Sequence, residues 1–105
     1  MAFLIDLRPG EEPMLVECED GGFTREQVRE IAGGDYVAVP TFMTDLVLLL
    51  CGEAEEGENV LATEMLSVTN NDVIYGRAML ARVVKNRVTG LARDRAEHWV
   101  RQLKE

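Results

Sequence analysis

The fold is decided by Asp45–Val84, which reads DLVLLLCGEAEEGENVLATEMLSVTNNDVIYGRAMLARVV and holds the two most apolar runs of the chain. The first run, Leu46–Cys51, is apolar at all six positions. A run of this length is typical of a strand buried on both faces and is far too short to span a bilayer. We therefore expect a central strand here, with the other elements packed around it.

The second half of this stretch predicts a short helix followed by a long strand. Asn59 is a residue type that caps helix N-termini, so a short helix is expected to run from it through Leu66. The polar run Ser67–Asp72 predicts a turn. Val73–Val84 carries apolar residues on both alternating faces and predicts the final strand, in which Gly76 marks a bulge or a close approach of two backbones.

The N-terminal segments predict additional strands. Residues 3–7 and 14–18 are short and apolar, and the turn signal Pro9-Gly10 lies between them, so they predict a β-hairpin. Residues 36–39 predict a further strand. Pro40 marks its end or a position at the edge of the sheet, because proline lacks the backbone N–H that a central strand needs.

One helix can be placed from its start signal. The residues Thr24-Arg25-Glu26-Gln27 match the capping box, in which the Thr hydroxyl and the Gln side chain each bond a backbone amide of the first turn. Phe23 and Val28 have the spacing of a hydrophobic staple around that cap. Gly33-Gly34 then predicts a left-handed stop.

The C-terminal segment predicts the other main helix, beginning after Thr89 or Gly90. Its expected inward stripe consists of Ala92, Ala96, Trp99, Val100 and Leu103. The length of 105 residues and the hydrophobic content of 47% suit one domain with a single core. We therefore predict one small α+β domain over residues 1–105, with two main helices and one short helix segregated from a mostly antiparallel sheet in the order β-β-α-β-β-α-β-α.

The charge of the chain is acidic overall and divided along the sequence. The formal net charge is −8, but residues 1–76 carry −13 and residues 77–105 carry +5. The acidic excess argues against general nucleic-acid binding, since phosphate contacts need a surplus of Lys and Arg. The basic tail either neutralises the acidic front within the fold or forms an anion site.

The sequence also predicts where the protein works. Two cysteines, Cys18 and Cys51, without a secretory leader suit a reducing cytosol. The N-terminus lacks the basic and apolar regions of a signal peptide, and no segment has the length of a transmembrane helix. We expect a cytoplasmic protein that does not bind membranes, and a homo-oligomer is left open.

No residue pattern predicts catalysis. His98 is the only histidine, and without a cysteine cluster or paired carboxylates it cannot form a standard zinc site, so we expect it to face solvent beside a core Trp99. The acidic loop at residues 53–58 lacks the Asp/Asn ladder of a calcium loop and is expected to be solvated. We predict no catalytic residue, no metal ligand and no cofactor.

A basic segment at residues 85–90 predicts an anion site. Two cations precede the expected helix start, whose free amides and positive dipole end favour a phosphate. Arg82 and Arg93 are expected nearby. The alternative is an ordinary solvated or acid-paired surface. The predicted ligand-binding residues are Lys85, Arg87, Thr89 and Gly90.

A second candidate site lies on the short helix. Asn59 and Thr63 are one turn apart there and could form a polar ligand pocket beside Tyr36 and Gly76. The alternative is that Asn59 only caps the helix and Thr63 only packs.

The chain from Phe23 onward resembles a family of uncharacterised proteins associated with phages and mobile elements, the DUF3846 domain family. The similarity lies in four segments, which cover about two-thirds of the chain: FTREQVREIAGGDYVAV (Phe23–Val39), LVLLLCGE, NVLATEML and DVIYGRAML. The resemblance implies a small intracellular protein of phages, plasmids or their hosts, and it supplies no established reaction. Proteins of that kind often bind a component of the host.

Three functions are therefore compatible with the sequence. The first is a non-enzymatic binding protein that modulates or inhibits a host component, such as one used in defence. The second is a binder or sponge of a nucleotide-like anionic small molecule. The third, an enzyme, is the least favoured, because these residues assemble no constellation of acid, base, nucleophile or metal.

Overall fold

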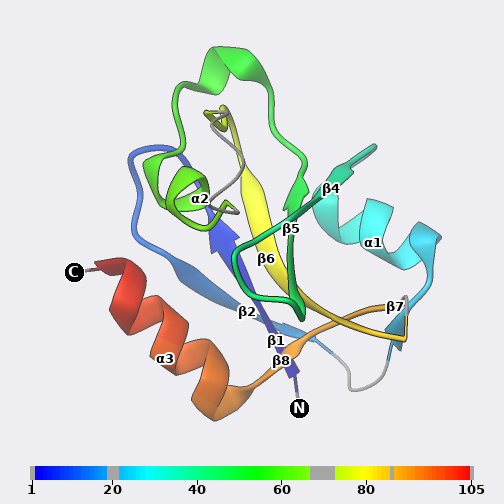
Figure 1. Ribbon diagram of the computed structural model, residues 1–105. Helices are drawn as coiled ribbons and strands as arrows, with labels where there is room; N and C mark the ends of the chain where they lie inside the picture. The colour runs from blue at the N-terminus through cyan, green and yellow to red at the C-terminus, as the bar shows by residue number, and fades with distance from the viewer. Residues whose placement is uncertain (1, 19–21, 67–72, 86, 105) are drawn as a thin grey trace.

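The computed structural model describes residues 2–18, 22–66, 73–85 and 87–104. Within these ranges it forms one antiparallel sheet with three α-helices and a 3-10 turn, η1 (Ala54–Glu56), which confirms the predicted α+β class (Figure 1). The helices are α1 (Arg25–Ala32), α2 (Val60–Glu64) and α3 (Arg93–Lys104). The strands are β1 (Ala2–Leu7), β2 (Met14–Cys18), β3 (Gly22–Phe23), β4 (Val37–Pro40), β5 (Leu46–Leu50), β6 (Ala78–Val84), β7 (Arg87–Thr89) and β8 (Leu91–Ala92).

The main strands lie in the order β2-β1-β6-β5-β4. The first two strands form the predicted hairpin, and β4 occupies an edge position, as Pro40 predicts. Leu46–Cys51 does form a strand buried on both faces, β5, although it ends at Leu50. The central position belongs to β6, which pairs with both β1 and β5. In these described residues no helix is long and apolar enough to cross a membrane.

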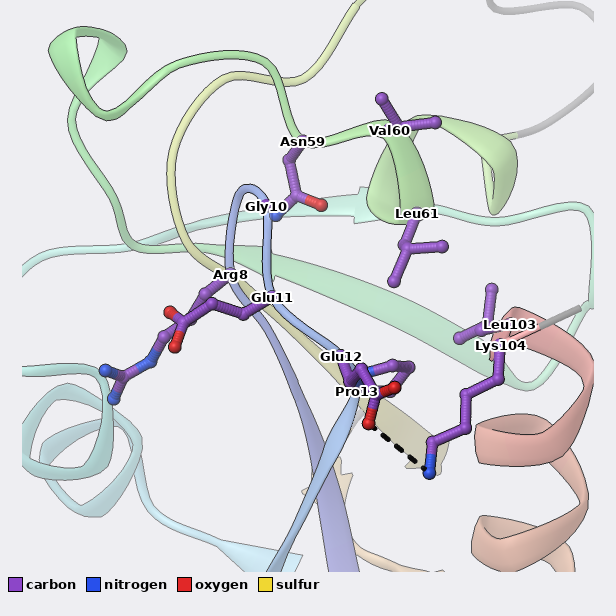
Figure 2. A pocket seen from close by; sticks show the side chains of 10 residues that line it. All are labelled: Arg8, Gly10, Glu11, Glu12, Pro13, Asn59, Val60, Leu61, Leu103 and Lys104. Carbon is purple, nitrogen blue, oxygen red and sulfur yellow. Dashed lines mark ion pairs between the residues drawn. The ribbon is translucent and has the colours of Figure 1, made fainter.

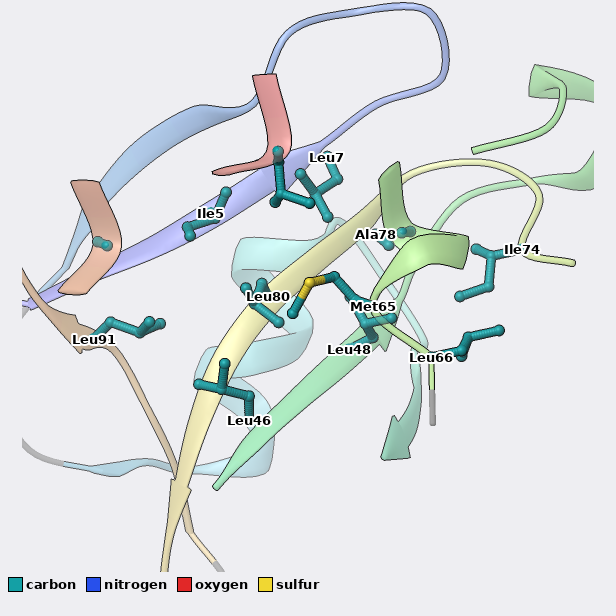
Figure 3. Close-up of a cluster of buried hydrophobic side chains, with 13 residues drawn as sticks. Ile5, Leu7, Leu46, Leu48, Met65, Leu66, Ile74, Ala78, Leu80 and Leu91 are labelled. Carbon is teal, nitrogen blue, oxygen red and sulfur yellow. The ribbon is translucent and has the colours of Figure 1, made fainter. Parts of the chain in front are cut away.

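The sheet separates two apolar clusters because alternate residues of a strand point to opposite faces. The first cluster lies between the sheet and the helices α2 and α3, and Figure 3 shows it around Leu48 and Leu80. The second lies between the sheet and α1, and it contains the intervening residues Val47 and Met79. The helices pack on an antiparallel sheet, as predicted. They cover both of its faces, with α2 and α3 on one face and α1 on the other (Figure 1).

Helix α1 begins and ends where the sequence predicts. The Thr24 hydroxyl accepts a hydrogen bond from the Gln27 amide at 3.2 Å, and the Gln27 side chain accepts one from the Thr24 amide at 2.8 Å. Gly33 has a φ of 83° and donates to the last carbonyls of the helix. Val28 is buried, and Phe23 packs against the same cluster. The capping box therefore fixes the start of the helix, and the left-handed glycine fixes its end.

The predicted strand Val73–Val84 is wrong in its first part, since β6 begins only at Ala78. Gly76 has a φ of 81°, and a Cβ placed on it would lie 2.6 Å from the Glu53 carbonyl oxygen. A side chain there would collide with a neighbouring backbone. The expected close approach of two backbones at Gly76 is thus correct. It interrupts the predicted strand, so β6 starts after Gly76 instead of bending at it.

The start of the last helix is also corrected. Lys85, at a φ of 51°, turns the chain after β6, and two short strands precede α3. Ala92 is therefore an exposed strand residue, whereas Ala96 and Leu103 are buried on α3 as predicted. The helix predicted as far as Leu66 ends at Glu64. The predicted turn Ser67–Asp72 lies outside the described residues, as do residues 19–21 and Asn86.

Candidate functional site

The predicted pocket around Asn59 and Thr63 is a network of structural hydrogen bonds. The Asn59 side-chain amide is 1% exposed, and it donates to the Leu7 carbonyl at 2.9 Å and to the Gly76 carbonyl at 2.8 Å. Its oxygen accepts from the Ala62 amide at 3.1 Å, which makes Asn59 the N-cap of α2. These bonds use the donors and the acceptor of the side chain, so little capacity remains for a ligand.

Thr63 is likewise engaged within the fold. Its hydroxyl donates to the Asn59 carbonyl at 2.8 Å and accepts from the Ile74 amide at 3.0 Å. Asn59 and Gly76 do meet, as predicted, but Tyr36 packs against the cluster on the other face of the sheet. The expectation that Tyr36 belongs to this site is therefore wrong, since the sheet lies between them.

A pocket of about 350 Å³ does open beside Asn59, between the β1–β2 loop, the start of α2 and the end of α3 (Figure 2). Leu61 and Leu103 form its apolar wall, and Glu12 pairs with Lys104 across its rim at 3.7 Å. Arg8 projects away from Lys104 and bonds the buried Asp6. We call this the hairpin pocket. Its rim carries both signs of charge, so it has no excess of cations for an anion.

The predicted anion site at Lys85–Gly90 lacks the helix start on which it depends. Lys85 and Arg87 flank the β6–β7 turn, and Thr89 lies in β7. Gly90 is buried against β1, where an added Cβ would lie 2.7 Å from the Ala2 Cβ. Because α3 begins only at Arg93, its amides are not next to the two cations. The four residues therefore do not form the expected cradle at a helix N-terminus.

The two further arginines expected at that site are engaged with acids. Arg82 lies 3.9 Å from Asp45, and Arg93 pairs with Glu97 at 3.1 Å. Both arginines therefore support the alternative of an acid-paired surface.

The structure instead brings two other arginines together with Tyr36. The capping box at Thr24 makes Arg25 the first residue of α1, and Arg29 follows one turn later on the same side of the helix. Gly33 then reverses the chain, and β4 follows alongside α1. A pocket of about 400 Å³ results, lined by Arg25, Arg29, Asp35, Tyr36, Ala38 and Val88. We call it the α1–β4 pocket.

The electrostatics of the α1–β4 pocket are set by three charged groups. Arg29 Nε donates to Asp35 Oδ1 at 3.0 Å, and a second guanidinium nitrogen donates to the same oxygen. These hydrogen bonds lower the pKa of Asp35 and raise the pKa of Arg29. Arg25 forms no ion pair with any described residue. The pocket therefore holds two cations and one anion, and the Arg25 guanidinium has no acidic partner among the described residues.

Other polar clusters in the described residues do not suggest catalysis. Asp6 is buried between Arg77, at 2.9 Å, and Arg8, at 3.0 Å, which is the arrangement of a structural ion pair. Burial raises the pKa of the nearby Cys51 thiol, which makes it a poor nucleophile. His98 is exposed, as predicted, and its ring forms a T-shaped contact with the ring of Trp99. No group of three potential metal ligands occurs in the described part of the chain.

Sequence reasoning missed the α1–β4 pocket, although it placed helix α1 correctly and named Tyr36 as a candidate ligand-binding residue. The spacing of Arg25 and Arg29 on a securely placed helix is a usable signal, and Tyr36 was already a candidate. The packing of β4 and Val88 beside α1 depends on tertiary structure, and no local sequence pattern predicts it. Comparisons with protein-family models, with curated proteins and with solved structures found no match. The resemblance to the DUF3846 family therefore stays a prediction.

Proposed function

We propose that this chain is a non-enzymatic binding protein that takes a nucleotide-like anion in the α1–β4 pocket. The observation that carries the proposal is the pair of guanidinium groups, Arg25 and Arg29, one helical turn apart beside the ring of Tyr36. The volume of about 400 Å³ falls within the range of small-molecule sites.

Each part of the pocket has a role in this proposal. Guanidinium groups bind phosphate oxygens through paired N–H donors, so Arg25 and Arg29 hold the anionic group between them. Tyr36 is half-buried and presents an aromatic ring against which a base can stack. Val88 and Ala38 supply apolar surface beside that ring. No group in this set acts as a nucleophile or a paired general base, which favours binding over turnover.

Calorimetric titration with adenosine 5′-monophosphate and with inorganic phosphate tests the proposal, at low and at moderate salt. Removal of both guanidiniums in R25A/R29A should weaken nucleotide binding by about tenfold or more, since hydrogen bonds to charged groups are lost. The variant Tyr36→Ala should reduce nucleotide binding to the level of phosphate alone, because the stacking surface is gone.

The double variant K85A/R87A is the matched control, since it removes two exposed cations at the originally predicted site. It should keep nearly the parent affinity. Equal losses in the two double variants would mean that binding reflects only the general charge of the protein. The absence of binding by the parent would refute the function.

A second candidate function is the modulation of a host protein in the cytoplasm, which is what the resemblance to DUF3846 implies. It is favoured by the exposed side chain of Val37 on the edge strand β4, which is 62% exposed. Edge strands with exposed apolar residues are common sites of pairing with another chain. Native purification followed by mass spectrometry of the denatured material distinguishes the two candidates. A retained nucleotide supports the first, and a stoichiometric protein partner without a nucleotide supports the second.

A further inference from the structure

Asp35 has no role in binding an anion, yet it lies in the α1–β4 pocket. Its carboxylate accepts two hydrogen bonds from Arg29, and no other described residue bonds it. The Asp35 side chain is 86% exposed, so it is not held there by packing. It follows Arg29 by only six residues, across the turn at Gly33. The carboxylate therefore occupies the position on Arg29 that a bound phosphate would need.

We propose that Asp35 is an internal competitor that occupies Arg29 until an anionic ligand displaces it. This inference rests on the proposed function, because it concerns the same pocket. A group tethered by so short a segment competes at a fixed effective concentration, of the order of millimolar, whatever the solution contains. Every anion that binds Arg29 must therefore displace the carboxylate, and contacts to Arg25 and Tyr36 supply additional binding free energy for a ligand that reaches all three residues.

Displacement makes a specific prediction about ligand charge. At high salt, which screens the charge of the displaced carboxylate, a competitor that must leave lowers the affinity of every anion by the same factor, whether the anion carries one charge or two. Plain repulsion by a nearby carboxylate would instead weaken a doubly charged ligand more than a singly charged one. The two mechanisms are therefore separated by two nucleotides with the same base and different charge.

The test is a calorimetric titration at high salt of the parent and of Asp35→Asn with adenosine 5′-monophosphate, adenosine 3′,5′-cyclic monophosphate and uncharged adenosine. We expect the variant to bind both nucleotides more tightly by the same factor of about two to five, the size expected when an exposed ion pair is removed. Its affinity for adenosine should equal that of the parent.

Glu30→Gln is the matched control, because it removes one exposed carboxylate of α1 that does not bond Arg29. It should leave the affinities for both nucleotides close to those of the parent. A gain in Asp35→Asn no larger than in Glu30→Gln, or a gain that is greater for the doubly charged nucleotide, would overturn the competitor role and leave the proposed function intact. If neither the parent nor Asp35→Asn binds a nucleotide, both proposals fail.

Discussion

Replacing Asn59 by Ala should be among the most destabilising substitutions in this protein. The change removes the cap of α2, which is worth about 0.5–2 kcal/mol at a helix N-terminus. It also removes the donors for the Leu7 and Gly76 carbonyls, which lie at 2.9 and 2.8 Å from the amide. A buried acceptor left without a partner costs about 1–3 kcal/mol. With one cap and at least one orphaned carbonyl, we expect a loss of about 1.5–5 kcal/mol.

Urea unfolding followed by far-UV circular dichroism measures this loss. Thr24→Ala is the control, because Thr24 caps α1 with the same chemistry at an exposed position and bonds no distant carbonyl. It should lose only the cap contribution, about 0.5–2 kcal/mol. A loss in Asn59→Ala no greater than in Thr24→Ala would refute the reasoning, since the two carbonyls would then cost nothing. If Thr24→Ala itself unfolds like the parent, its cap does not stabilise α1.

Three further predictions concern stability. Gly76→Ala should lower the melting temperature more than Gly33→Ala. Both glycines have a positive φ, but only at Gly76 would an added Cβ collide with a neighbouring backbone. Equal decreases in melting temperature would contradict this close approach. Asp45→Asn should reduce the unfolding free energy at pH 7 by about 1 kcal/mol or less for this partly exposed pair. The hydrogen bond from Arg95 lowers the pKa of Asp45, so this contribution to stability should be complete above about pH 4 and disappear as the pH falls through the lowered pKa. A difference in unfolding free energy between parent and Asp45→Asn that persists in strong acid would contradict this prediction. Arg77→Ala should cost more in urea unfolding than Arg8→Ala, because Arg77 is the less exposed partner of the buried Asp6, and equal losses would argue against that ranking.

The parts of the fold that sequence alone predicts are those with local signals. The capping box at Thr24 and Gln27 needs only four residues to be recognised, and the apolar run of β5 needs only six. The strands β7 and β8 are three and two residues long, so they carry no periodicity, and the sequence predicts the approach to a helix in their place. The predicted helix therefore begins just after Thr89 or Gly90 instead of at Arg93, and the predicted anion site is misplaced with it.

The candidate sites were harder to predict because they depend on which face of the sheet a residue reaches. Asn59 bonds the carbonyl of Leu7, 52 residues away, and no pattern near Asn59 indicates that contact. The sequence predicts Tyr36 and Asn59 in one polar site, but the alternation of the central strands places α1 and α2 on opposite faces of the sheet. The residue type of Tyr36 thus indicates a candidate ligand-binding residue. Only the tertiary structure shows that it lies beside Arg25 and Arg29 of α1.

The edge strand β4 has a consequence for how this protein behaves in solution. Within the described residues β4 pairs only with β5, and Val37 and Ala38 on it are exposed, so backbone groups of one chain are open to pairing with another. The net charge of −8 opposes such an encounter at neutral pH by mutual repulsion. That repulsion vanishes near the isoelectric point of about 4.6. Colloidal stability should therefore fail around that pH while the fold is still intact, and the turbidity formed there should dissolve when the pH is returned to neutral.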